Sequence, residues 1–105
     1  MNKATSTLSA NFNLSTIPIA NPSVIFREGL DDWAVLVNMD TAASIALNPT
    51  GILIWKMIDG KRNVESIMNG VKDQFRSVPE SFTDDVVSML DVLFQDGFVG
   101  QEVRA

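Results

Sequence analysis

Neither cysteine nor histidine occurs among the 105 residues of the sequence. The chain therefore lacks a thiol nucleophile, the usual ligands of zinc and iron–sulfur sites, and the side chain that most often acts as a base near neutral pH. We predict no metal site and no cofactor. No disulfide can hold the fold, but 46% of the residues are hydrophobic, enough for one core. This length suits one domain and excludes a two-domain enzyme.

Long apolar runs are also missing. No stretch reaches the roughly 18 apolar residues of a membrane-spanning helix, and residues 1–20 hold no apolar run of signal-peptide length. We therefore expect a soluble, cytoplasmic protein that binds no membrane. Acidic residues outnumber basic ones by 13 to 8, and the net charge of -5 repels nucleic acid and anionic lipid. The expected partner is a protein, a peptide or a small molecule.

The chain divides into an amino-terminal arm and one domain. Residues 1–21 are rich in Ser, Thr, Asn and Ala and are predicted to form a flexible arm, in which Ile17 and Ile19 could add a strand. Residues 22–105 form the predicted domain. It begins with three short apolar or β-branched stretches separated by turn-forming residues: 23–27, 33–37 and 43–47. The short loops between them indicate an antiparallel meander.

After residue 47 the apolar period changes from two residues to 3.6. Asn48 and Asn63 are predicted N-caps of a first and a second helix, and Pro79 opens a third helix that ends at Gly97. Trp55 is expected to anchor the first helix where it meets the sheet. The predicted fold class is α+β, a three-stranded antiparallel meander followed by a three-helix, winged-helix-like unit.

A winged-helix pattern suggests a DNA-binding transcriptional regulator, which needs a positively charged recognition helix. The longest predicted helix, residues 80–96, instead carries five acidic residues and no basic one. Lys56, Lys61 and Arg62 form a small basic cluster, which is typical of a solvated turn. We therefore expect no nucleic-acid binding, and a regulator or another protein-interaction module remains the alternative function.

Two adjacent acidic pairs, Asp31–Asp32 and Asp84–Asp85, are the candidates for carboxylate catalysis. Neighbouring residues on a helix point about 100° apart, so Asp84 and Asp85 cannot share a proton as a catalytic dyad does. Their negative charges are predicted to interact favourably with the helix dipole at the start of the third helix, whereas Asp31 and Asp32 belong to a turn. We expect no catalytic residue and no enzymatic activity.

Phe98 and Val99, after the third helix, could add a short wing strand. The last strand of the predicted meander, residues 43–47, has one edge whose backbone N–H and C=O groups are unpaired unless this wing covers it. Its side chains are mostly small, and no Lys or Pro blocks the approach of another strand. The third helix carries apolar residues beside its core stripe, among them Val92 and Phe94. These residues contact either a partner or the sheet and the first helix, so the pattern leaves both interpretations open.

Short motifs with a characteristic order and spacing cover about residues 22–100. They are Trp33-Ala-Val-Leu-Val-Asn38, Leu47-Asn-Pro-Thr-Gly51, Ile54-Trp55, Asp59-Gly60-Lys61-Arg62, Val64-Glu-Ser-Ile67, Asp85-Val86, and Leu90-Asp-Val-Leu93 followed by Gly97. Together they resemble the PqqD family, the pyrroloquinoline quinone biosynthesis protein D type, also called the RiPP recognition element. The resemblance implies three strands followed by a three-helix winged-helix unit, as the periodicity predicts.

The resemblance also implies a function, that of a peptide chaperone. Family members bind the leader of a ribosomally synthesised precursor peptide and present it to a modifying enzyme, often a radical S-adenosylmethionine (SAM) enzyme. The leader adds as a strand between the third strand and the third helix. The implied peptide-binding residues are Ser44, Ile45, Ala46, Asp85, Ser88, Met89 and Val92. The sequence leaves open which side of the third helix faces this groove.

Overall fold

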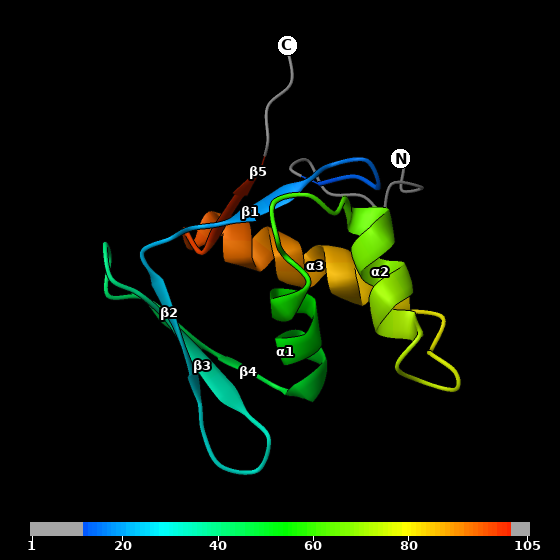
Figure 1. The fold of residues 1–105 in the computed structure, drawn as a ribbon, viewed down its shortest axis with the longest axis horizontal. Coiled ribbons are helices and arrows are strands. Elements are labelled where there is room, and N and C mark those ends of the chain that lie inside the picture. Colours follow the sequence, from blue (N-terminus) through cyan, green and yellow to red (C-terminus); the bar gives the residue numbers. More distant parts are fainter. Residues whose placement is uncertain (1–11, 102–105) are drawn as a thin grey trace.

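A computed structural model describes residues 12–101 and shows a mixed α and β architecture (Figure 1). The elements in chain order are β1 (Pro18–Ala20), β2 (Val24–Glu28), β3 (Ala34–Asn38), β4 (Ser44–Leu47), α1 (Pro49–Lys56), α2 (Val64–Lys72), α3 (Phe82–Gln95) and β5 (Val99–Gln101). Strands β2, β3 and β4 form an antiparallel sheet in that order. The predicted fold class, a three-stranded meander followed by three helices, is thus confirmed.

A second, two-stranded sheet joins the two ends of the described chain. Strand β1 pairs antiparallel with β5, with Ile19 opposite Gly100, and Figure 1 shows the two strands side by side. The side-chain nitrogen of Asn21, just after β1, donates to the carbonyl oxygen of Gly97 at 3.0 Å. The segment containing Ile17 and Ile19 therefore supplies an additional strand, which pairs with the last strand rather than with the meander.

The predicted flexible arm is wrong for residues 12–21, because the segment before β1 also packs into the domain. The side chain of Phe12 is only 1% exposed and belongs to the core. The carbonyl oxygen of Thr16 accepts a hydrogen bond from the N–H of Val64, the first residue of α2, at 2.9 Å. Residues 1–11 of the predicted arm lie outside the described residues.

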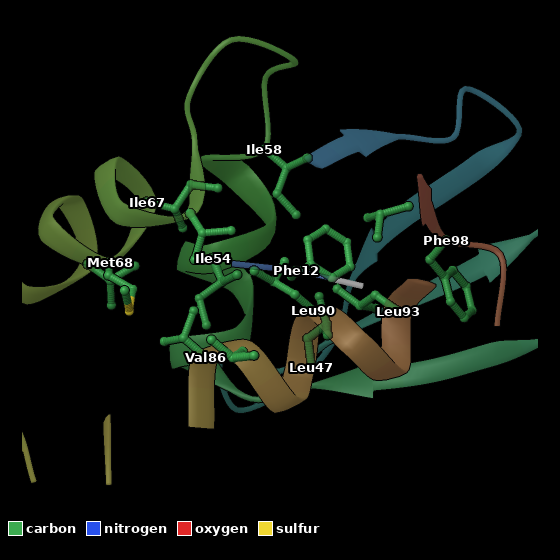
Figure 2. Close-up of a cluster of buried hydrophobic side chains, with 14 of the residues drawn as sticks. Phe12, Leu47, Ile54, Ile58, Ile67, Met68, Val86, Leu90, Leu93 and Phe98 are labelled. Carbon is green, nitrogen blue, oxygen red and sulfur yellow. The ribbon is translucent and has the colours of Figure 1, made fainter. Parts of the chain in front are cut away.

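The hydrophobic core lies between the helices and the inner face of the sheet (Figure 2). The residue of α1 that enters it is Ile54, at 2% exposure, whereas Trp55 is only partly buried at its margin. Trp55 packs against the core without being fully buried, so its role as the anchor of this helix stays a prediction. Adjacent helical residues point about 100° apart, so the orientation that buries Ile54 turns Trp55 aside. Other core side chains are Leu36, Leu47, Ile67, Leu90, Leu93 and Phe98.

Asn38, at the end of β3, fixes the carboxyl end of α3 relative to the sheet. Its buried amide nitrogen donates to the carbonyl oxygens of Gly97, at 3.0 Å, and Asp96, at 3.4 Å. Gly97 has a φ of 82°, and a Cβ atom there would lie 2.9 Å from the amide nitrogen of Asn38. Both the left-handed backbone and this close approach favour glycine at the end of α3.

We expect the replacement Asn38→Ala to destabilise the domain. It removes the buried amide that bonds the carbonyl oxygens of Gly97 and Asp96 and the N–H of Asp40, and the loss of these hydrogen bonds costs about 1–3 kcal/mol. In a domain of this size each kcal/mol lowers the melting temperature by about 4–8 °C, which circular dichroism would detect. The control Asn69→Ala removes the same side chain from an exposed position in α2. Equal melting temperatures for the two variants would contradict the proposed role of Asn38.

Candidate functional site

Strand β4 is one of the two outer strands of its sheet, and its edge away from β3 is open. The N–H of Asn38 donates to the carbonyl oxygen of Ala43 at 2.8 Å, which sets the hydrogen-bonding phase of the β3–β4 ladder. Bonded and non-bonded pairs alternate along an antiparallel ladder. The backbone groups of Ile45 therefore face β3, and those of Ser44 and Ala46 face outward. No strand among the described residues pairs with this edge.

The side chains of β4 alternate between the two faces of the sheet. Leu47 is 3% exposed and Ile45 is partly buried against the core, while Ser44 and Ala46 are exposed. Side chains at alternate positions of a strand share one face. The edge thus offers outward-facing backbone donors and acceptors next to apolar side chains that point toward the helices.

A cavity of about 560 Å³ lies beside this edge. It is bounded by β4, the start of α1, the loop between α2 and α3, and the first half of α3. A Cβ atom on Gly51 would lie 3.3 Å from the Cε atom of Met89 in α3. Glycine at this position therefore lets the start of α1 approach α3 closely. The lining residues are Trp33, Ile45, Ala46, Leu47, Asn48, Thr50, Gly51, Ile54, Phe75, Ser77, Val78, Pro79, Phe82, Asp85, Val86 and Met89.

The predicted site residues divide into two groups around this cavity. Ile45 and Ala46 of β4 and Asp85 and Met89 of α3 line it. The other three do not line it: Ser44 lies at the exposed start of β4, and Ser88 and the 44% exposed Val92 lie on the exposed part of α3. The side of α3 that faces the cavity is therefore the side of Asp85 and Met89, a point that the sequence left open.

Two aromatic residues at the rim of the cavity were not predicted as part of the site. Trp33 precedes β3 and is 47% exposed, and Phe75 follows α2 and is 43% exposed. Two large aromatic side chains that are this exposed beside one cavity indicate a binding surface, because large apolar side chains are usually more buried. Exposure depends on the tertiary structure, so the apolar periodicity of the sequence could not identify them.

The basic cluster consists of Lys56, the last residue of α1, and of Lys61 and Arg62 in the turn between α1 and α2. Hydrogen bonds from the backbone N–H groups of Arg62 and Lys61, at 3.0 and 2.9 Å, lower the pKa of the Asp59 carboxyl. Arg62 also forms an ion pair with Asp59 at 3.4 Å, and Lys56 forms one with Glu28 at 3.7 Å. Lys56 and Arg62 therefore have carboxylate partners, as expected for solvated surface charges.

The cavity itself is electrostatically simple. Asp85 is the one ionisable residue among its described lining residues, and the rest are apolar or neutral. Among residues 12–101 no group of three or more acidic, histidine or cysteine side chains could hold a metal ion. Within the same range, none of the helices has the length and apolarity needed to cross a membrane. The chemistry of the cavity suits the apolar side chains of an extended peptide.

Comparison with known proteins supports a family relationship. The family model described as "Coenzyme PQQ synthesis protein D" matches residues 34–99, more than half of the chain. Among solved structures, the chain is similar to TbiB1, which was determined in complex with the TbiA(beta) leader peptide. That likeness has a TM-score of 0.64 at 20% identity and covers 83% of this chain and 98% of TbiB1, which establishes a shared fold. No curated protein matches the chain.

Proposed function

The chain belongs to the PqqD family, and we propose that it binds the leader segment of a ribosomally synthesised precursor peptide. In this proposal the leader adds as a strand to the open edge of β4 and places side chains in the cavity beside α3. The observation that carries the proposal is the apolar cavity next to the outward-facing backbone groups of Ser44 and Ala46. The likeness to TbiB1, solved with a leader peptide, supports it.

The geometry of strand addition defines which guest side chains are recognised. Guest residues opposite Ser44 and Ala46 exchange backbone hydrogen bonds with them. Guest residues opposite Ile45 and Leu47 direct their side chains to the same face, toward Phe82 and the other α3 residues of the cavity. The groove therefore selects apolar side chains at alternate positions of the leader, while the backbone bonds supply affinity that is independent of sequence.

We further propose that the chain presents the bound precursor to a separate modifying enzyme. A radical SAM enzyme is the partner that the family resemblance implies. Because the sequence contains no cysteine and no histidine, the chain lacks the thiol and imidazole groups on which most redox and acid–base chemistry depends. The proposed role is therefore binding and presentation, with the covalent chemistry assigned to the partner.

The substitution Val92→Asp tests whether the exposed side of α3, from Asp85 through Met89 to Val92, forms one wall of the peptide groove. Val92 lies three residues beyond Met89 on the exposed part of α3, where we propose that the groove continues from the cavity past Ser88. A carboxylate facing an apolar guest should weaken binding by about 1–3 kcal/mol, or roughly 5- to 150-fold. The measurement is calorimetric titration with the leader of the precursor encoded near this gene, together with thermal melts.

The control for this test is Asn69→Asp, which changes the charge by the same amount at an exposed position of α2 that does not line the cavity. We expect it to bind like the wild type. Wild-type affinity in both variants would contradict the assignment of Val92 to the wall, while a similar loss in both would point to general charge repulsion.

We expect no binding to duplex DNA, which separates this proposal from a winged-helix regulator. Helix α3 contains no Lys or Arg, its exposed side carries the acidic Asp85, and its C-cap residue is the acidic Asp96. Phosphate attraction is strongest at low ionic strength, so low salt is the most demanding condition. An electrophoretic mobility shift at low micromolar protein that salt reverses would restore the regulator hypothesis.

A further inference from the structure

A second cavity, of about 440 Å³, lies next to the first. It is bounded by the turn between β2 and β3, by α1, and by the residues that follow α2. Ile52 and Leu53 of α1 contribute apolar side chains, and Glu28 and Asp32 contribute carboxylates. The first cavity is lined by one acidic residue, Asp85, so the second cavity has the more acidic lining.

The two cavities meet at the exposed aromatic pair Trp33 and Phe75, which lines both of them. Trp33 directly precedes Ala34, which pairs with Leu47 at the end of β4. A peptide that leaves the β4 edge past Leu47 therefore reaches the aromatic pair first and the second cavity next. This continuity makes the second cavity an extension of the proposed peptide groove.

The chemistry of the second cavity favours a long cationic side chain. The methylene groups of Lys or Arg can pack on Trp33 and Phe75, and a cation near an aromatic face gains a cation–π attraction. Glu28 already has Lys56 as an exposed ion-pair partner at 3.7 Å, whereas Asp32 has no salt bridge among the described residues. A guest cation can therefore pair with Asp32 without displacing a partner.

We propose that this second cavity binds a Lys or Arg side chain of the same guest peptide, beyond the segment that pairs with β4. The inference rests on the proposed function, because the guest is the peptide added to the β4 edge. It adds a second element of specificity. The guest carries alternating apolar residues for the first cavity and a basic residue at the end that leaves β4 past Leu47.

The test uses 14-residue peptides selected from a random phage-displayed library against the full chain. We expect the selected peptides to combine an alternating apolar block with a Lys or Arg on one side of it. In fluorescence anisotropy, changing that basic residue to Gln should weaken binding about 5-fold, in the range of a partly exposed charge pair with an aromatic contact. Asp32→Asn should cause a similar loss and make the chain indifferent to the Lys-to-Gln change.

The matched control is Asp31→Asn, which removes the same charge from the adjacent turn residue that does not line the cavity. It should bind the selected peptides like the wild type. The inference is overturned if Asp32→Asn and Asp31→Asn have equal affinities, or if the selected peptides lack the basic residue. Failure of the proposed function is distinguishable, because Ser44→Pro would then bind these peptides normally, or no peptide would be selected.

Discussion

Replacing Phe12 by alanine is expected to unfold a large part of the protein at physiological temperature. Phe12 is 1% exposed and its ring meets that of Phe94 edge to face, with centroids 5.7 Å apart and planes at 86°. Removing a buried phenylalanine side chain typically costs about 3–5 kcal/mol, a large share of the roughly 5–15 kcal/mol that stabilises a domain. The melting temperature should fall by at least about 12 °C, as measured by circular dichroism.

The matched control is Leu14→Ala in the same segment. Leu14 is 39% exposed, and its carbonyl bond to the N–H of Glu65 survives the substitution. Its melting temperature should therefore stay close to that of the wild type. If Phe12→Ala also melts within a few degrees of the wild type, the packing of the Phe12 side chain contributes little stability.

The burial of Phe12 shows what the sequence could not predict. Phe12 is an isolated aromatic residue in a segment rich in Ser, Thr and Asn, so it belongs to no apolar period. Its ring packs against Phe94 of α3, and the β1 strand that follows it pairs with β5; both partners are distant in sequence. Local composition predicts disorder for such a segment. Only the tertiary structure shows that the core has space for the Phe12 side chain.

The helices could be predicted because their signals are local. The side-chain oxygens of Asn48 and Asn63 accept the N–H groups of Gly51 and Ser66, each at 2.8 Å, so both predicted caps are confirmed. Such a cap involves residues only three positions apart. The third helix begins later than expected, at Phe82, because Pro79 lies in a turn that the N–H of Phe82 closes on the carbonyl of Pro79.

The candidate site was predictable in part. The open edge of β4 follows from strand order, since a meander leaves its last strand outermost. The face of α3 and the aromatic rim depend on how the helices pack. Phe82 and Val86 were assigned to the core stripe, and they are buried, yet they also line the cavity. A residue at the boundary between core and groove has the same sequence pattern as a core residue.

Proline substitutions in β4 should separate folding from binding. At Ile45 the backbone N–H faces β3, so Ile45→Pro removes a bond inside the sheet together with a partly buried side chain. Proline cannot donate to the ladder and is therefore found essentially only at open edges or bulges of a sheet. We expect Ile45→Pro to be largely unfolded by circular dichroism and to have a strongly lowered melting temperature.

At Ser44 the backbone N–H faces the open edge, where proline is tolerated in a strand. Ser44→Pro should therefore melt like the wild type, yet bind the leader at least about tenfold more weakly, because the guest strand loses a backbone donor and meets the proline ring. Ser44→Ala, which keeps the N–H, should bind normally in the same calorimetric titration. Wild-type affinity in a folded Ser44→Pro variant would show that the guest does not pair with β4, and the loss of binding in Ser44→Ala would instead assign the contact to the hydroxyl.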